Sequence, residues 1–150
     1  MSVLSWGKPK IEIAPFVNGA LPATPTWAVV TTPKEGTTKL TPTKGAKKEA
    51  KLSGGEFKDV KYAKNTYVFE FEIQVGREET KPIEDEDGVV TNNYAVRVTP
   101  EDDTLQGFLL EKTAVTVEES WSDEDGALLK YTFDVLKPAT GKMVKPYTKA

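Results

Sequence analysis

The sequence predicts an all-β protein, an antiparallel β-sandwich or flattened barrel, in a single domain over residues 1–150. Three observations favour this class. Residues 65–76 alternate apolar and polar side chains along their whole length, which is the period of a strand and not of a helix. Residues 113–137 contain two further alternating runs joined by a turn. Four prolines between residues 20 and 45 exclude a long helix there.

The segment 65–76 is predicted to be the core strand that recruits the rest of the sheet. Its aromatic residues all fall on one face, whereas Glu70 and Glu72 fall on the other, so one side is expected to be buried and the other wetted. Together with one arm of the later hairpin, this strand supplies the candidate core residues Tyr67, Phe69, Phe71, Ile73, Tyr131, Phe133 and Val135.

A first short strand is predicted at residues 10–13, ended by the turn pair Asn18-Gly19. Residues 1–10 are expected to form an N-terminal arm. Residues 138–150 are polar, contain two prolines, and are expected to form a C-terminal arm.

Residues 37–52 alternate weakly and carry many lysines, which is typical of a protected edge strand. The turn at residues 53–55 contains two glycines. Residues 56–62 then lead into the core strand, with Phe57 and Val60 as further candidate core residues.

Residues 77–93 form a long, polar, acidic connection. Most connections in compact domains have about 4 to 6 residues, and loops beyond about 12 are usually functional or disordered. The pair Asp87-Gly88 is a turn signal, so this segment is predicted to be a projecting loop or hairpin with its tip at that pair.

At most one short helix is expected, at residues 100–106. Thr99 is a suitable N-cap, Pro100 suits the first helical position, and the following acids favour the helix dipole. Gly107 limits the length of this helix.

The clearest hairpin has arms at residues 113–121 and 127–137, joined by an acidic turn at residues 122–126. On its second arm, Leu128 and Leu136 lie on the face opposite the candidate core residues. Apolar residues on both faces indicate a strand that is covered on both sides, by the core and by a neighbouring subunit.

The composition excludes several chemistries. With no cysteine and no histidine, the chain has no disulfides, thiolate zinc sites or Ser-His-Asp triad. No apolar run approaches the ~18 residues of a membrane helix, and the start of the chain lacks a secretory pattern, so cytoplasmic synthesis and no membrane partner are expected. Residues 1–64 hold 11 lysines against five acids, a net +6, whereas the remainder is −9. This asymmetry indicates either two oppositely charged surfaces or ordinary solvated faces.

The acidic turns at residues 84–88 and 123–126 offer oxygen ligands for a cation, but the spacing of a calcium-binding helix–loop–helix is not met, and ordinary turn chemistry is favoured. Glu70 and Glu72 could flank a sugar as glycosidase acids do, but solvent-facing strand positions explain them better. The lysines of residues 44–64 could contact phosphates, although no nucleic-acid motif accompanies them.

Trp6, Trp27 and Trp121 could form a sugar-stacking platform, but core or interface packing is favoured. No catalytic, cofactor-binding or metal-binding residues are predicted, and the protein is not expected to be an enzyme.

Four stretches together resemble the major tail tube proteins of long-tailed phages and prophages: GKPKIEIAPFVNGA, TTKLTPTKGAKKEAKLSGGE, KNTYVFEFEI and TVEESWSDEDGALLKYTF. The resemblance implies a virion structural protein, made in the host cytoplasm, that self-assembles into hexameric rings. It implies that these homo-oligomers stack into a tail tube with other tail proteins as partners, and that DNA passes through without being bound. Family members use terminal arms and a long hairpin loop for ring-to-ring contact.

On this resemblance, Glu70 and Glu72 would face an acidic lumen. The ring-stacking loop would be the segment 77–93, with the candidate residues Glu79, Glu84, Asp85, Glu86, Asp87 and Asn92. The family has a small flanking helix, and the lack of a convincing long helix here is a departure that leaves the sandwich subtype open.

Two other classes remain open. A monomeric β-sandwich binding module, immunoglobulin-like or carbohydrate-binding, would use the acidic loop 77–93 as its recognition surface. An enzyme working through paired carboxylates is the third reading.

Overall fold

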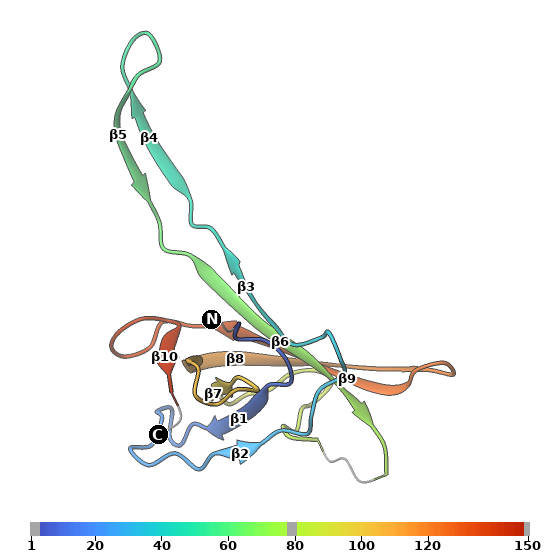
Figure 1. The fold of residues 1–150 in the computed structure, drawn as a ribbon. Coiled ribbons are helices and arrows are strands. Elements are labelled where there is room, and N and C mark those ends of the chain that lie inside the picture. Colours follow the sequence, from blue (N-terminus) through green and yellow to red (C-terminus); the bar gives the residue numbers. More distant parts are fainter. Residues whose placement is uncertain (1–3, 78–80, 149–150) are drawn as a thin grey trace.

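The computed structural model describes residues 4–77 and 81–148, and this part of the chain is all-β, with no helix (Figure 1). The prediction of an antiparallel all-β protein is confirmed. The strands of the described residues are β1 (Lys10–Pro15), β2 (Ala28–Val29), β3 (Lys39–Thr43), β4 (Lys47–Lys51), β5 (Phe57–Tyr62), β6 (Thr66–Val75), β7 (Tyr94–Thr99), β8 (Gly107–Ser122), β9 (Gly126–Val135) and β10 (Lys145–Tyr147).

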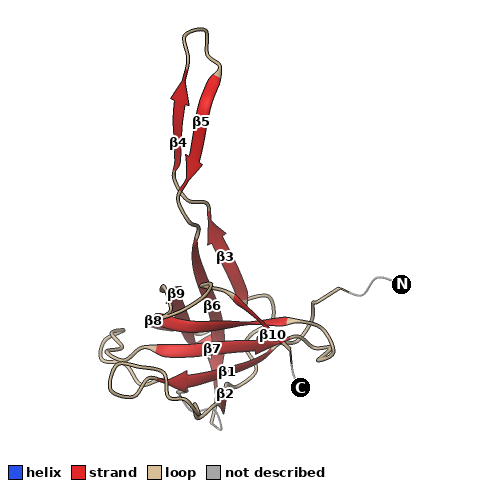
Figure 2. Ribbon diagram, turned by 90° about the vertical axis from the view of Figure 1, so that its left-hand side faces the viewer, coloured by secondary structure: helices blue, strands red, loops and turns tan. Residues whose placement is uncertain are grey.

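One antiparallel sheet has the strand order β2-β1-β7-β8-β9-β6-β3, and β10 pairs with β8 beside this path. The long strand β8 joins two halves of this sheet. Its residues 107–109 pair with β10, whereas its residues 113–122 pair with β9. The register with β7 shifts between these stretches, and such a bulge bends a strand. The two halves therefore face each other as the layers of a sandwich-like fold (Figures 1 and 2).

The core lies between β1 and β7 on one side and β6 and β9 on the other. Aromatic rings fill its centre: Phe71 stacks on Tyr131 and on Phe133, with ring centroids 5.5 and 5.7 Å apart. The predicted core is confirmed, with Tyr67 partly buried at its edge and the following residues buried: Phe69, Phe71, Ile73, Tyr131, Phe133 and Val135.

The core strand β6 is not in the middle of the sheet. Only β3 lies beyond it, and β8 has the middle place. β8 takes this place because its 16 residues are long enough to pair with β7, β9 and β10.

The element that projects from the sandwich is the two-stranded ribbon of β4 and β5, which extends beyond β3 and the start of β6 (Figures 1 and 2). The predicted edge strand is present as β3 and continues into this ribbon as β4. The prediction of Phe57 and Val60 as core residues is wrong, because Phe57 is 54% exposed and Val60 is only partly covered. Lysines on both strands leave no apolar face broad enough to pack on the core.

The predicted projection at residues 77–93 is also wrong, because the described part of this segment packs back on the sandwich. Ile83 is 2% exposed, and its carbonyl accepts a hydrogen bond from the Tyr131 hydroxyl at 3.3 Å. The Val117 N–H donates to the Gly88 carbonyl at 3.1 Å. The predicted turn at Asp87 is present, with a φ of 52°. One buried isoleucine therefore holds an otherwise acidic loop against β8 and β9.

The short helix expected at residues 100–106 is absent, and turns take its place. Thr99 belongs to β7 and does not cap a helix. The carboxylate of Asp102 accepts hydrogen bonds from the N–H and hydroxyl of Thr104, which favours a local turn over a helical ladder.

The two arms differ in how they are held. At the N-terminus, Leu4 and Trp6 are 65% and 76% exposed. At the C-terminus, β10 pairs with β8, and Lys145 forms an ion pair with Glu111. The C-terminal arm is therefore part of the sheet, which its polar sequence did not indicate.

Candidate assembly surfaces

Two surfaces of opposite charge lie at opposite ends of β6. The ribbon of β4 and β5 enters β6 at Thr66. At the other end of this strand, Val75 pairs with Ala127, next to the acidic turn between β8 and β9. Ten residues at ~3.3 Å per residue separate the two ends by about 30 Å. We call residues 44–64 the hairpin arm, and residues 81–88 with 118–125 the acidic end.

The hairpin arm has one aromatic face. Lys47 and Lys51 lie over the ring of Phe57, with their Nζ atoms 5.0 and 5.1 Å from its centroid. Glu49 lies between these lysines, 2.7 Å from the Nζ of Lys47 and 3.6 Å from that of Lys51. Tyr62 pairs with Lys47 across the ribbon and is 58% exposed. The face thus combines half-exposed aromatic rings with lysines that lie over them and one carboxylate.

The base of the arm is narrow. A Cβ at Gly45 would lie 2.0 Å from the carbonyl oxygen of Ala63, so only glycine permits this close approach of the two chain segments. The N–H of Gly45 donates to Asn65 at 3.1 Å, and the N–H of Ala63 donates to the Ala46 carbonyl at 2.8 Å. The arm is therefore a continuous ribbon, whose base is closed by one backbone hydrogen bond and one bond to the Asn65 side chain.

The charge of the arm is positive, with seven lysines against three acids, a net +4. A two-stranded ribbon with no core of its own is marginally stable in water. The predicted phosphate contacts and the predicted edge role both concern these lysines. The structure places them on a free-standing arm.

The acidic end contains a network of ion pairs at its base. The Nζ of Lys81 lies 3.1 Å from the Oδ1 of Asp85 and also pairs with Glu119. These carboxylates, Glu119 first, raise the pKa of Lys81. The N–H of Gly88 donates to Asp85 at 2.8 Å, and this bond, followed by the pairing with Lys81, lowers the pKa of Asp85.

Beyond this network the acidic end is open to solvent. Trp121 is 74% exposed and forms the wall of a pocket of about 380 Å³, with Val75 and Leu129 also lining it. The β8–β9 turn beside it is closed by Gly126, with a φ of 74°. Residues 81–88 and 118–125 together hold nine acids against one lysine, a net −8.

The outer face of β6 carries the predicted lumen residues Glu70 and Glu72. Glu70 lies 3.0 Å from the Nζ of Lys39 and 3.6 Å from that of Lys130, and the bond with Lys39 is the main cause of its lowered pKa. Glu72 pairs across the sheet with Lys130, which in turn pairs with Glu118 on β8. This face is therefore polar, with carboxylates and lysine alternating across the strands.

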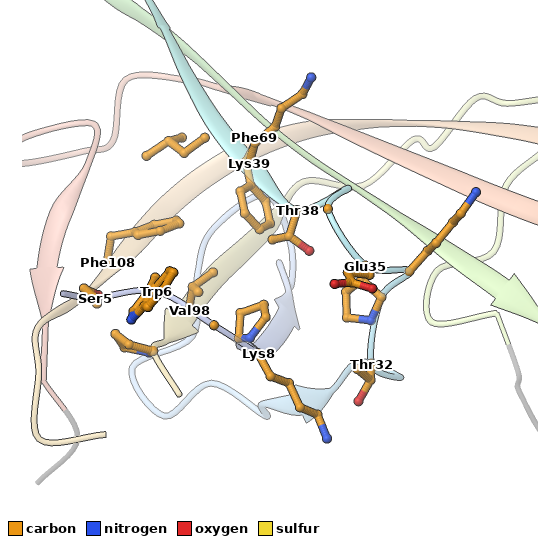
Figure 3. A pocket seen from close by; sticks show the side chains of 18 of the residues that line it. Ser5, Trp6, Lys8, Thr32, Glu35, Thr38, Lys39, Phe69, Val98 and Phe108 are labelled. Atoms are coloured by element: carbon orange, nitrogen blue, oxygen red, sulfur yellow. The ribbon is translucent and has the colours of Figure 1, made fainter. Parts of the chain in front are cut away.

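A further pocket, of about 760 Å³, opens where the N-terminal segment crosses the end of the sandwich (Figure 3). Trp6, Val98 and Phe108 point into this opening, and Phe69 lies at its back. Lys8 and Lys39 lie at its rim. The opening is apolar inside and basic outside.

Sequence reasoning missed a cluster around Arg97. The guanidinium donates two hydrogen bonds to Glu12, at 3.1 and 2.9 Å, and lies 4.3 Å from the ring centroid of Trp27 and 5.1 Å from that of Tyr147. Glu12 is 7% exposed. Arg97 thus joins β1, β7, the segment before β2 and the C-terminal strand. The contacts span 85 residues of sequence, so no local pattern could indicate them.

The remaining predicted residues lie apart. Glu84, Asp85, Glu86 and Asp87 belong to the acidic end, away from the outer face of β6. Asn92 donates from its side-chain amide to the Phe16 carbonyl at 2.9 Å and holds the loop to the sandwich. The predicted residue Glu79 lies outside the described residues, as do residues 1–3 and 149–150 of the two predicted arms.

The three tryptophans do not form a common platform. Trp27 packs with Arg97, whereas Trp6 and Trp121 line separate pockets. Over residues 4–77 and 81–148, no group of three or more carboxylates is arranged to hold a metal ion. No helix in the described part of the chain has the length and apolar character that a bilayer crossing requires.

Comparison with known proteins gives no name to these surfaces. No family model matches the chain, and no curated protein matches it in sequence.

Proposed function

We propose that this protein is a structural subunit that associates with further copies of itself, as the tail tube subunit of a long-tailed phage or prophage. The observation that carries the proposal is the opposite charge at the two ends of β6, an arm of net +4 and an acidic end of net −8. Such ends attract between copies and not within one copy. Contacts between unlike surfaces either close into rings or continue as filaments.

The hairpin arm takes the part that the family resemblance gives to a long hairpin loop. It replaces the segment 77–93 in that role, since the described part of this segment covers β8 and β9. The arm projects from the sandwich with all residues of β4 and β5 except Val60 exposed, so its removal would uncover little of the core.

In a ring of six copies, the outer face of β6, β9 and β8 would line the lumen. Its cross-strand row places Glu72 and Glu118 on either side of Lys130, and Glu70 is neutralised in part by Lys39. Excess carboxylate on this face would repel DNA phosphates and let the duplex pass without binding. Other tail proteins would then be partners at the ends of the tube.

A monomeric binding module is the second candidate, and the pocket in Figure 3 favours it. Its volume, about 760 Å³, is within the range of small-molecule sites, and its interior is apolar and aromatic. This pocket would replace the acidic loop as the recognition surface.

The test is light scattering coupled to size exclusion over a concentration series, with negative-stain images of each peak. The tube proposal expects rings or tubes whose share grows with protein concentration. A strict monomer at every concentration would contradict it and favour the binding module.

A further inference from the structure

We infer that the aromatic face of the hairpin arm docks into the Trp121 pocket at the acidic end of a second copy of this chain. The inference rests on the proposed self-association and identifies the two surfaces that meet. It would make Phe57 and Trp121 the anchors of the contact, with lysines and carboxylates around them.

Lysine side chains cover the aromatic rings of the arm only in part, with Lys44 over Tyr62 and Lys47 and Lys51 over Phe57, so both rings stay open to solvent. Leu52, Phe57 and Tyr62 are 49%, 54% and 58% exposed. These three side chains lie on one projecting ribbon. Contiguous exposed apolar residues, rimmed by polar ones, mark interaction sites in soluble proteins.

The Trp121 pocket is the matching receptor by shape and polarity. Val75, Trp121 and Leu129 give its lining apolar surface, and the one lysine of the lining, Lys81, is ion-paired with Glu119. Its volume of about 380 Å³ is sufficient for one aromatic side chain. Glu119 lies within the pocket lining, and the acidic turn 123–125 follows directly on the chain.

Charge complementarity selects this receptor over the larger pocket in Figure 3. The lining of the larger pocket carries Lys8, Lys34 and Lys39 against one carboxylate, Glu35, and this net positive charge would repel an arm of net +4. The acidic end, at −8, would attract the arm and orient its lysines toward the turn 123–125.

The charges on the hairpin arm favour a protein partner over a DNA duplex. A two-stranded ribbon can enter a DNA groove, and seven lysines would favour phosphates. However, Glu49 lies inside the aromatic face and pairs with both flanking lysines, so it would face the phosphate backbone. A carboxylate between two lysines suits a partner that carries both acids and apolar side chains.

One copy cannot make this contact with itself, because the arm and the pocket lie at opposite ends of β6. The contact therefore joins the head of one copy to the tail of the next. An open assembly of any length retains one free arm at one end and one free pocket at the other, so the association continues until a ring closes or a filament forms.

The experiment uses two variants that each lose one surface. Phe57→Ala removes the anchor on the arm, and Trp121→Ala removes the wall of the pocket. Each variant alone should self-associate at least about 30-fold more weakly than the wild type in sedimentation velocity, because anchors of this kind dominate interface energies. Both side chains are exposed, so the thermal midpoints should stay at the wild-type value.

Mixing the two variants gives the decisive readout. The Trp121→Ala copy keeps an intact arm and the Phe57→Ala copy keeps an intact pocket, so the mixture should form 1:1 dimers and stop there. The matched controls are Val29→Ala, an exposed apolar residue on the sheet edge, and Lys142→Glu, an exposed lysine outside the arm. Both should associate as the wild type does.

Three outcomes would overturn the inference. Wild-type assembly that persists in both variants would leave the proposed function standing and place the contact elsewhere. A wild type that is monomeric at every concentration would remove both proposals. A wild type that binds a short DNA duplex at physiological salt, and loses that binding in Lys47→Glu without any change in self-association, would assign the arm to nucleic acid.

Discussion

The two hairpins β4–β5 and β8–β9 have similar local structure but different places in the fold. Both are antiparallel pairs closed by glycine-containing turns. In β8 and β9, every second residue over most of the pairing is buried, including Val115, Val117 and Phe133. In β4 and β5, charged residues occupy both faces, and all residues except Val60 are exposed. Burial of a full apolar face makes one hairpin part of the core, and its absence leaves the other free for contacts outside the chain.

The largest expected difference in the free energy of unfolding is between phenylalanine-to-alanine substitutions in the two hairpins. Phe133→Ala should lower the free energy of unfolding by about 3–5 kcal/mol, because the ring is fully buried and its removal leaves a cavity beside the rings of Phe69 and Phe71. Phe57→Ala should change it by less than about 0.5 kcal/mol, because the ring lies on the free-standing arm. Urea unfolding monitored by circular dichroism measures both. Equal losses would show that the arm packs on the sandwich.

Much of the core hairpin and of β6 could be predicted because a strict alternation of large apolar residues both identifies a strand and orients it. Phe69, Phe71 and Tyr131 carry enough apolar area that no other face could be buried. Residues 56–62 were expected to lead into the core strand with Phe57 and Val60 in the core, whereas residues 57–62 form β5 on the arm. One phenylalanine and one valine among lysines indicate a strand without enough apolar area to hold it on the core.

The rest depended on contacts between distant parts of the chain. Ile83 is a single apolar residue in an acidic loop, and its burial follows from a gap over Tyr131 that only the folded sandwich defines. The pairing of Arg97 with Glu12 likewise requires β1 and β7 to be neighbours. The candidate surfaces were therefore predictable in charge, from the split between the two halves of the sequence, but not in position.

A second comparison concerns the loop that was expected to project. Ile83→Ala should lower the free energy of unfolding by about 2–4 kcal/mol, because Ile83 is buried under the acidic segment. Val89→Ala, six residues later in the same loop, should have an effect below about 0.5 kcal/mol, because Val89 is 60% exposed. Chemical denaturation of the two variants decides the matter. If Ile83→Ala unfolds like the wild type, the loop is detachable, and a role as a projecting contact returns.

The Arg97 cluster should have a smaller effect than the core. Arg97→Ala would leave the Glu12 carboxylate, 7% exposed, without its bidentate partner. Removing one partner of a fully buried ion pair lowers the free energy of unfolding by about 3–5 kcal/mol. Because the Arg97 guanidinium is partly exposed, we expect a loss of about 2 kcal/mol here. Arg97→Lys should recover only part of the loss, because an ammonium cannot form the fork or stack between Trp27 and Tyr147. Full recovery in thermal melts would show that charge alone matters at this position.

The smallest expected effect of a substitution is at Tyr131 on the core hairpin, and it should depend on pH. Burial raises the pKa of Tyr131 from 10.0 to about 12. The unfolded chain therefore loses this proton first, and between pH 10 and 12 the stability should fall with rising pH, by up to about 1.4 kcal/mol per pH unit from this group. Tyr131→Phe should be about 1 kcal/mol less stable than the wild type near neutral pH, because the hydrogen bond to the Ile83 carbonyl is lost. That difference should shrink and then reverse as the pH rises, since the variant has no phenol to ionise.

Tyr62→Phe on the hairpin arm is the control for this prediction, because it removes an exposed hydroxyl. Urea midpoints at several pH values test this. Wild-type and Tyr131→Phe curves that stay parallel up to pH 12 would mean that the buried phenol does not couple its proton to folding.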